Sequence, residues 1–258
     1  MQIFLEKPVH LVVIMKLQDI QANWDKFGTS DPLWSILAWP DKSGHRWPIE
    51  TFFATGVQEI AEVLTTIAAL GLPLERGRAL DFGCGVGRLT QALAEHFAQV
   101  DGVDISPAML ALAVHYNRHG ERCRYHLNET DDLARFGDET FDFVYSNITL
   151  QHMPPRFARA YLREFLRVLK PEGVLIFQLP ERPYQWHRRL IQLLRPTRLF
   201  RLYQRLRHGE RPVMDMFGIP RPQVIAWLTA HGGRVVAVQP DQSADRHWSS
   251  FRYVVVKV

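Results

Sequence analysis

The sequence predicts an α/β fold, with helices on both faces of a doubly wound sheet of seven strands whose last strand is antiparallel. Three observations lead to this prediction. From Arg78 onward, short apolar segments alternate with segments of helical periodicity, as in parallel strands joined by right-handed crossovers. The first apolar segment runs into the glycine-rich turn Gly83–Gly87. The last two apolar segments have no helix between them, which indicates a hairpin and hence one antiparallel strand.

The individual elements follow from periodicity, caps and turns. In the helix after the glycine turn, Leu89, Leu93 and Phe97 share one face. Ser106 can cap the next helix, and a glycine pair closes the last one. The expected strands are Ala79–Phe82, Val100–Asp104, Cys123–Leu127, Phe141–Tyr145, Val174–Leu179, Val235–Val238 and Phe251–Val258, and the expected helices are Gly87–Phe97, the segment after Ser106, Pro155–Leu169 and Pro222–His231, with a turn at Pro171–Gly173.

Two regions lie outside this core. Residues 1–77 form an N-terminal segment and helical cap rich in aromatic side chains, in which Phe52–Gly56 leads into an expected helix Val57–Leu70. Residues 78–258 form the main domain, interrupted after the fifth strand by the arginine-rich residues 181–220. We expect this insertion to form a lid of two short amphipathic helices, broken near Pro196.

Composition limits the possible functions. Of the 258 residues, 47% are hydrophobic and 22% are charged, as in ordinary soluble globular proteins, and the net charge is +4. Cys84 and Cys123 provide neither a disulfide framework nor metal-ligand spacing, so we expect no metal and a reducing, cytoplasmic location. No apolar run approaches the roughly 20 residues of a membrane span. Val9–Met15 is expected to be a strand or a leader rather than a signal peptide, with Met15 as an alternative start.

Two aspartates and three glycines meet where the first strand turns into a helix. Asp81 ends the first strand, Gly83, Gly85 and Gly87 follow, and Asp104 ends the next strand, 17 positions after Gly87. Glycine permits a sharp turn and close approach of a ligand, and an acidic residue at the second strand end commonly binds ribose hydroxyls. We therefore expect a ligand with a ribose here; the alternative is that the two aspartates only cap turns.

The chemistry of the turn narrows the choice of ligand. A dinucleotide fingerprint needs a small residue where Thr90 stands, and the charge of Asp81 would repel a pyrophosphate. The Gly-Lys-Ser/Thr of a P-loop is absent from the turn. S-adenosylmethionine carries an ammonium group and a ribose but no phosphate, so it fits better.

With these motifs the chain resembles the class I S-adenosylmethionine-dependent methyltransferases, which have a Rossmann-like fold. The resemblance extends from Arg78 to Val258 and is strongest to bacterial methyltransferase-domain proteins of the general small-molecule type. It rests on four motifs in family order: Leu80–Arg88, Val103–Ser106, Phe141–Ser146 with Leu150–His152, and Leu169–Gly173.

The resemblance implies roles for the matching residues. Asp131 is an alternative to Asp132 at the adenine, because the spacing before Phe136 departs slightly from the commonest pattern. Arg88 is expected on the helix surface, with a contact to the ligand's carboxylate as the alternative. The implied cofactor-binding residues are Asp81, Gly83, Cys84, Gly85 and Gly87 in the turn, with Asp81 and the backbone of Gly83 and Gly85 at the methionine moiety, then Asp104 at the ribose, Ile105, Met109, Asp132 and Leu133 at the adenine, and the Asn147 carbonyl at the ligand's amino group.

The expected activity is transfer of a methyl group from S-adenosylmethionine, leaving S-adenosylhomocysteine, to an oxygen or nitrogen of a small or medium-sized metabolite. His152 follows the fourth strand and is the candidate catalytic base; alternatively it orders the loop or touches the cofactor. The Asn-Pro-Pro-aromatic motif of amide and adenine-N6 methylation is absent after this strand, and neither cysteine is placed like a nucleophile for cytosine.

Two other functions stay open from the sequence. One is a protein that binds S-adenosylmethionine without transferring its methyl group. The other is a methyltransferase for a lipid or a nucleic acid, which would contact the membrane or the nucleic acid through Arg188–Arg211. We favour a solvated lid for this arginine-rich segment.

Overall fold

The computed structural model describes residues 15–185, 206, 209 and 212–258 of the chain. The predictions for the apolar segment before Met15, for the two amphipathic helices around Pro196 and for partner contacts through Arg188–Arg211 therefore fall largely outside the described residues. The division of the chain at residue 77 stays a prediction.

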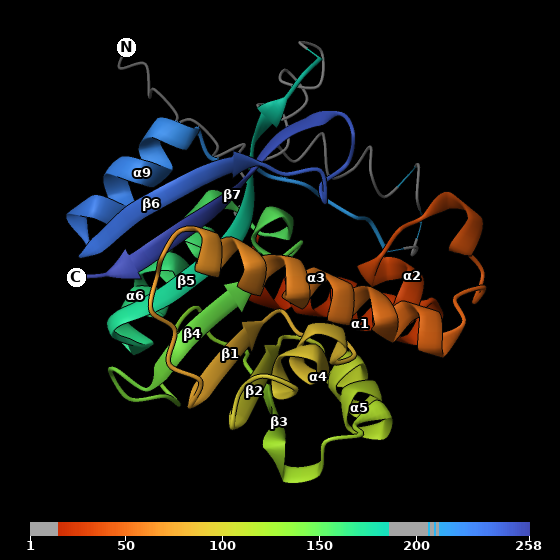
Figure 1. The fold of residues 1–258 in the computed structure, drawn as a ribbon. Helices are drawn as coiled ribbons and strands as arrows, with labels where there is room; N and C mark the ends of the chain where they lie inside the picture. Colours follow the sequence, from red (N-terminus) through yellow and green to blue (C-terminus); the bar gives the residue numbers. More distant parts are fainter. Residues whose placement is uncertain (1–14, 186–205, 207–208, 210–211) are drawn as a thin grey trace, which may run out of the picture.

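A seven-stranded sheet in the order β3-β2-β1-β4-β5-β7-β6 forms the centre of the protein (Figure 1). Parallel pairs join β3, β2, β1, β4 and β5, whereas β7 lies between β5 and β6 and is antiparallel to both. The predicted fold class and antiparallel last strand are thus confirmed. The strands are β1 (Arg78–Phe82), β2 (Gln99–Asp104), β3 (Cys123–Leu127), β4 (Phe141–Ser146), β5 (Leu169–Pro183), β6 (Gly233–Pro240) and β7 (Trp248–Lys257).

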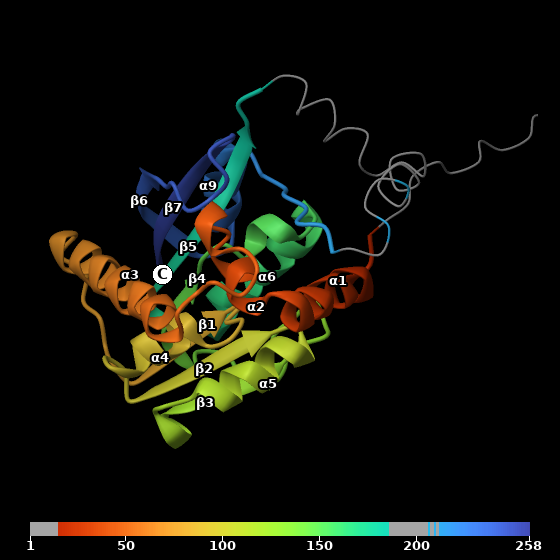
Figure 2. The ribbon, with the colours of Figure 1, turned by 90° about the vertical axis from the view of Figure 1, so that its right-hand side faces the viewer.

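Helices cover both faces of the sheet (Figures 1 and 2). Alternate residues of each strand point to opposite faces, so Val174 and Ile176 of β5 pack with α3 and α4, whereas Leu175 and Phe177 pack with α6 and α9. The α-helices are α1 (Leu17–Ser30), α2 (Pro32–Ile36), α3 (Ile49–Ala69), α4 (Arg88–Ala94), α5 (Pro107–Tyr116), α6 (Pro155–Val168) and α9 (Arg221–Ala230), with short 3-10 helices η1 (Pro40–Lys42), η2 (Gly120–Arg122) and η3 (Leu150–His152).

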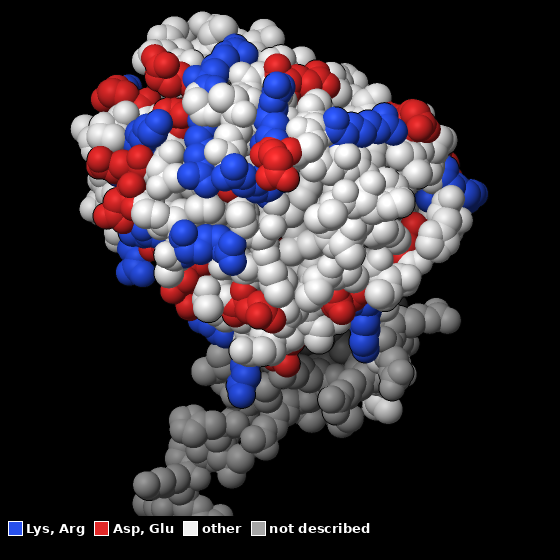
Figure 3. All heavy atoms as spheres, turned by 90° about the horizontal axis from the view of Figure 1, so that it is seen from below, with Lys and Arg blue, Asp and Glu red and all other residues white. Residues whose placement is uncertain are grey.

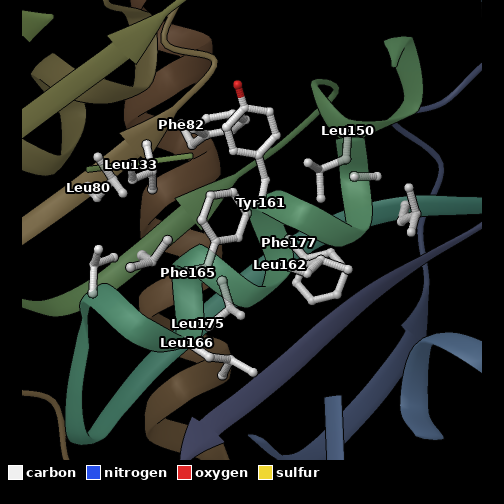
Figure 4. Close-up of a cluster of buried hydrophobic side chains, with 14 of the residues drawn as sticks. Leu80, Phe82, Leu133, Leu150, Tyr161, Leu162, Phe165, Leu166, Leu175 and Phe177 are labelled. Atoms are coloured by element: carbon white, nitrogen blue, oxygen red, sulfur yellow. The ribbon is translucent and has the colours of Figure 1, made fainter. Parts of the chain in front are cut away.

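Aromatic rings fill the core between the sheet and α6. Figure 4 shows Tyr161 and Phe165 of α6 beside Phe82 of β1. The ring centroid of Phe82 lies 4.4 Å from that of Tyr161 and 4.9 Å from that of Phe165. Such tilted and edge-to-face pairs add to the free energy gained by burial. This packing fixes the position of the strand that leads into the glycine turn.

The N-terminal helices pack on the domain next to the carboxyl ends of its strands. Oδ1 of Asp25, on α1, accepts hydrogen bonds of 2.9 Å from the hydroxyl of Ser106 and from the backbone amide of Ala108, at the start of α5. Ser106 itself caps α5, as predicted, by accepting a bond of 3.2 Å from the amide of Met109. A carboxylate at a helix N-terminus is stabilised by the unpaired amides and the helix dipole.

Two predicted boundaries are wrong for physical reasons. Helix α3 begins at Ile49 rather than Val57, and Gly56 lies inside it instead of ending a lead-in segment. A Cβ at Gly56 would lie 2.5 Å from the backbone oxygen of Arg88, so this glycine allows α3 to approach α4 closely. Strand β5 begins at Leu169, and the predicted turn at Pro171–Gly173 lies within its bounds as an irregularity in the pairing with β4.

Charges of both signs are mixed on the face seen from below. Figure 3 shows lysine and arginine side chains interspersed with acidic ones, beside a wide region of other residues. Among the described helices, none is long and apolar enough to cross a membrane.

Candidate active site

An open cavity, whose empty space of about 930 Å³ includes adjoining solvent, lies at the carboxyl ends of β1, β2 and β4, where open α/β sheets bind their ligands. The glycine turn, helices α1 and α2, the loop after β4 and Tyr161 of α6 provide its walls. Of the predicted site residues, eight line this cavity and four do not. The lining residues are Leu17, Ile20, Trp24, Ser35, Ile36, Phe82, Gly83, Cys84, Gly85, Arg88, Leu89, Val103, Asp104, Ile105, Met109, Asn128, Asn147, Ile148, Thr149, His152, Met153 and Tyr161.

The glycine turn has a backbone that side chains would disrupt. Gly83, Gly85 and Gly87 have φ values of 79°, 53° and 83°, in the left-handed region that favours glycine. A Cβ at Gly83 would overlap the side chain of Thr149, and a Cβ at Gly85 would lie 2.6 Å from Cδ1 of Ile36. The turn therefore requires glycine for its conformation and for the close approach of neighbouring groups. Gly87 does not line the cavity but forms the N-cap of α4.

The carboxylate of Asp104 is fixed at the cavity wall by two backbone amides. Its Oδ2 accepts a bond of 2.8 Å from the amide of Gly85, and its Oδ1 accepts one of 2.9 Å from the amide of Ser106. Burial raises the pKa of Asp104 above its ordinary value, although these amides and that of Ile105 work in the opposite direction. Each oxygen keeps a further lone pair, so the carboxylate can accept two hydrogen bonds from a diol.

Asp81 is fully buried rather than placed on the cavity wall. Its exposed fraction is 0%, its Oδ2 accepts a bond of 2.6 Å from the hydroxyl of Thr90, and its Oδ1 has no hydrogen-bond partner among the described residues. Burial raises the pKa of Asp81 to about 7. The charge of Arg88 lowers this pKa, whereas the charges of Glu59 and Asp104 raise it, so three neighbouring charges act on the ionisation of Asp81. An approaching cation would favour the ionised form of Asp81.

Arg88 is a buried residue of the cavity wall, so the prediction of a helix-surface arginine is wrong. Only 3% of Arg88 is exposed, and its Nη2 donates a bond of 2.9 Å to Oε2 of Glu59. The cause is α3, which packs directly on the start of α4 and covers it. Glu59 was not predicted from the sequence, although it follows the buried residues Phe52 and Gly56 of α3 at helical spacing and therefore lies on the same face. A carboxylate at that spacing is a signal that could have identified it.

His152 lies on the cavity wall as a buried, neutral imidazole. Its Nδ1 lies 2.7 Å from the carbonyl oxygen of Asp215, which can only accept a hydrogen bond, so Nδ1 carries the proton. Its Nε2 is then an acceptor and lies 3.0 Å from the Nε2 of Gln151, which donates to it. The ring centroid of Trp24 lies 5.0 Å away. Burial lowers the pKa of His152 to about 4.

The residues expected at the adenine are divided between two places. Ile105 and Met109 line the cavity, whereas Asp132 and Leu133 do not. The amide of Leu133 donates a bond of 2.9 Å to Oε2 of Glu164, and Oδ1 of Asp132 accepts one of 2.8 Å from the hydroxyl of Thr130. Both groups are thus used within the protein. The cavity residue closest in sequence to this loop is Asn128, whose Nδ2 donates a hydrogen bond of 3.2 Å to the hydroxyl of Tyr161, a second cavity residue.

Residues 80–177 match the family model described as a methyltransferase domain. The domain belongs to the class I S-adenosylmethionine-dependent methyltransferases. The match spans the glycine turn, Asp104 and the loop that follows β4. The family predicted from the sequence is therefore confirmed, as is S-adenosylmethionine as the family's cofactor.

Curated relatives of this methyltransferase domain cover part of the chain. The chain is 30% identical over 156 residues to a ubiquinone biosynthesis O-methyltransferase of Xanthomonas campestris pv. campestris (strain B100). The aligned residues cover 60% of this chain and 59% of the relative. A protein of the same name from Xanthomonas oryzae pv. oryzae (strain PXO99A) is 34% identical over 105 residues, covering 40% of this chain and 43% of the relative. The chain thus spans less than two thirds of the length of these relatives.

Solved structures share the fold over nearly the whole chain. Magnesium protoporphyrin IX methyltransferase from Synechocystis PCC 6803, crystallised with bound S-adenosylhomocysteine, superposes with a TM-score of 0.62 at 19% identity, over 94% of this chain and 99% of that one. A methyltransferase from Leishmania major gives a TM-score of 0.63 at 14% identity, over 95% of this chain and 87% of that one. At such identities the likeness establishes the fold of the methyltransferase domain alone.

Proposed function

We propose that this protein transfers a methyl group from S-adenosylmethionine to a hydroxyl oxygen of a small or medium-sized metabolite. The observation that carries the proposal is the carboxylate of Asp104, held at the cavity wall by the amides of Gly85 and Ser106 with lone pairs left for a ribose diol. When bound, S-adenosylmethionine supplies an activated methyl group. The cytoplasmic location expected from the cysteines belongs to the same proposal.

The residues of the cavity fit this cofactor. Gly83 and Gly85 line the cavity with backbone that no side chain of their own covers, and Ile105 and Met109 offer apolar surfaces to an adenine. Arg88 lines the cavity and Asp81 is buried outside its lining, and the two carry charges of opposite sign that suit the zwitterionic methionine end. The contacts of Asp132, Leu133 and Asn147 with the cofactor stay predictions. Asn128, on the cavity wall, is a further candidate for the adenine edge.

The remaining cavity wall favours an apolar or aromatic acceptor. Leu17, Ile20 and Trp24 of α1 and Met153 after η3 line the cavity with apolar side chains. An acceptor with a hydroxyl on a ring would bury its apolar body there and leave only the reacting group polar. The relatives named as ubiquinone biosynthesis O-methyltransferases support oxygen rather than nitrogen as the reacting atom.

His152 is the candidate base for this hydroxyl. With Nδ1 donating to the Asp215 carbonyl, Nε2 is the ring nitrogen that can take a proton, and its lowered pKa makes His152 a weak base at neutral pH. In the reaction, Nε2 would accept the hydroxyl proton while the oxygen bonds to the methyl carbon and the carbon–sulfur bond breaks. Because Gln151 donates to this Nε2, the acceptor hydroxyl must take the place of the Gln151 amide.

Transfer of a labelled methyl group from S-adenosylmethionine to a panel of phenols, aliphatic alcohols and amines tests the proposal. We expect labelled product with apolar phenols, and loss of activity in Asp104→Ala. Transfer only to amines would contradict the oxygen assignment. Binding of S-adenosylhomocysteine without transfer to any member of a broad panel would favour the alternative of a non-catalytic binding protein.

A further inference from the structure

One carboxylate of the N-terminal segment connects two parts of the cavity wall. Oε1 of Glu59, on α3, accepts hydrogen bonds of 2.7 Å from the hydroxyl of Tyr145 and of 2.7 Å from Nδ2 of Asn147. Its Oε2 accepts one of 2.9 Å from Nη2 of Arg88. Glu59 therefore ties the end of β4 to the start of α4. Arg88 and Asn147 line the cavity, whereas Glu59 contacts both of them without lining the cavity itself.

Glu59 also balances the charge of this wall. Burial acts to raise the pKa of Glu59, but the charge of Arg88 and the bonds from Tyr145 and Arg88 outweigh it, so that its pKa is lowered and it stays ionised. Among the described residues, Arg88 has one other side-chain partner, the hydroxyl of Thr55, to which its Nη1 donates a hydrogen bond of 3.3 Å. Its buried Nε has no hydrogen-bond partner among the described residues. Without Glu59 the guanidinium would be a buried, uncompensated charge.

The chemistry of this wall matches the amino-acid end of S-adenosylmethionine. In the proposed function Asp104 binds the ribose. The cavity wall also contains the guanidinium of Arg88, which follows the glycine turn, and the side-chain amide of Asn147, which follows β4. A guanidinium is suited to bind a carboxylate through its fork of donors. Its orientation would depend on the group that holds its Nη2, which is Glu59.

We propose that Glu59 is a positioning residue for the amino-acid end of the cofactor, acting through Arg88 and Asn147. The cofactor site would then be completed by a helix of the N-terminal segment, outside residues 80–177 that match the methyltransferase family. This inference rests on the proposed function. It adds a residue that never touches the cofactor but determines how tightly one half of it binds.

Two ligands that differ only at the amino-acid end distinguish a role of Glu59 in positioning that end from a role in the stability of the whole fold. S-adenosylhomocysteine and 5′-methylthioadenosine share the adenine, the ribose and a thioether, but the second lacks the amino-acid group. Isothermal titration calorimetry would measure both for the wild type and for Glu59→Gln, which keeps the shape and removes the charge. The matched control is Glu62→Gln, an exposed glutamate one turn further along α3.

We expect the wild type to bind S-adenosylhomocysteine more tightly than 5′-methylthioadenosine. Glu59→Gln should weaken S-adenosylhomocysteine about ten-fold or more, as for loss of a charge-assisted contact, and leave 5′-methylthioadenosine within about two-fold. Glu62→Gln should change neither. Arg88→Lys keeps the positive charge beside Glu59 but removes the planar set of guanidinium donors. This variant should show the same selective loss of affinity for S-adenosylhomocysteine, and it replaces Glu59→Gln if that variant folds poorly.

Three outcomes would overturn the inference. One is an equal loss of affinity for both ligands in the variants, which would indicate a merely structural role. The others are an unchanged affinity of the variants for S-adenosylhomocysteine, and a wild type that binds the two ligands equally tightly. A folded wild type that binds neither ligand would instead overturn the proposed function, and the inference with it.

Discussion

The backbone amide of Gly85 donates a hydrogen bond of 2.8 Å to Oδ2 of Asp104, so the carboxylate at the end of β2 holds the middle of the glycine turn. Oδ1 of the same carboxylate accepts from the amide of Ser106. Asp104 therefore has two tasks, since it shapes the turn and faces the cavity. A side chain with only one accepting oxygen cannot perform both.

Asp104→Ala should weaken binding of S-adenosylhomocysteine by at least about ten-fold, because a hydrogen bond to a charged group contributes about 1.5–3 kcal/mol. Asp104→Asn should not restore the affinity, because its amide nitrogen would face one of the two backbone amides. Calorimetric titration of both variants checks this. Wild-type affinity in either variant would remove the ribose assignment.

Affinity for S-adenosylhomocysteine should fall at acid pH because of Asp81. The pKa of this carboxyl is about 7 in the free protein through burial, with Glu59 and Asp104 also raising it and Arg88 lowering it. The ammonium group of a ligand favours the ionised form, so binding is tight above pH 7 and weakens about ten-fold per unit as the pH falls below it.

Titrations at pH 6, 7 and 8 would show this dependence, and Asp81→Asn should bind weakly with a flat profile. The variant also separates Asp81 from Asp104, whose pKa is raised as well. An equal dissociation constant for the wild type at pH 6 and pH 8 would contradict the role of Asp81.

Gly83→Ala should destabilise the fold more than Gly44→Ala does. Both glycines have nearly the same positive φ, 79° at Gly83 and 78° at Gly44. A Cβ at Gly44 meets no atom within 4 Å, whereas one at Gly83 overlaps Thr149. Gly44→Ala should therefore show only the left-handed backbone cost of about 1–2 kcal/mol, and Gly83→Ala a further 1–3 kcal/mol or so from overpacking. Chemical denaturation measures both, and equal losses would mean that Thr149 moves aside freely.

His152 should stabilise the protein in a pH-dependent way. Burial lowers its pKa from 6.5 to about 4, so the neutral ring is favoured in the folded state. The stability linked to this shift is fully present above pH 6.5 and is lost as the pH falls toward 4. The difference in melting temperature between the wild type and His152→Gln should therefore shrink from pH 7.5 to pH 5. A difference that stays constant over this range would show that the ring is protonated in the fold or accessible to water.

The sequence was sufficient to predict the elements that depend on local pattern. Strand β3 spans the predicted Cys123–Leu127, and the hairpin of β6 and β7 was predicted from the missing helix between them. The position of Asp104 at the edge of the sheet, where it lines the cavity, could be predicted from the strand end and from its spacing after the glycines.

Contacts between distant segments escaped prediction. Arg88 is buried and Gly56 lies inside a helix because α3 packs on α4, and a single sequence does not show which surface that helix covers. Glu59 joins residues that lie 29 and 88 positions away along the chain. For the same reason, Leu133 matched the motif although its amide donates to Glu164, 31 positions away. Asp132 matched it although the nearby Thr130 donates to its carboxylate.

Calorimetric titration of the folded wild-type protein with S-adenosylhomocysteine at pH 8 tests the central claim most directly, because it requires no knowledge of the acceptor. The account predicts saturable binding of one ligand per chain, strongly weakened in Asp104→Ala. A folded protein that shows no heat of binding at several temperatures, and no rise in melting temperature with the ligand, would contradict it.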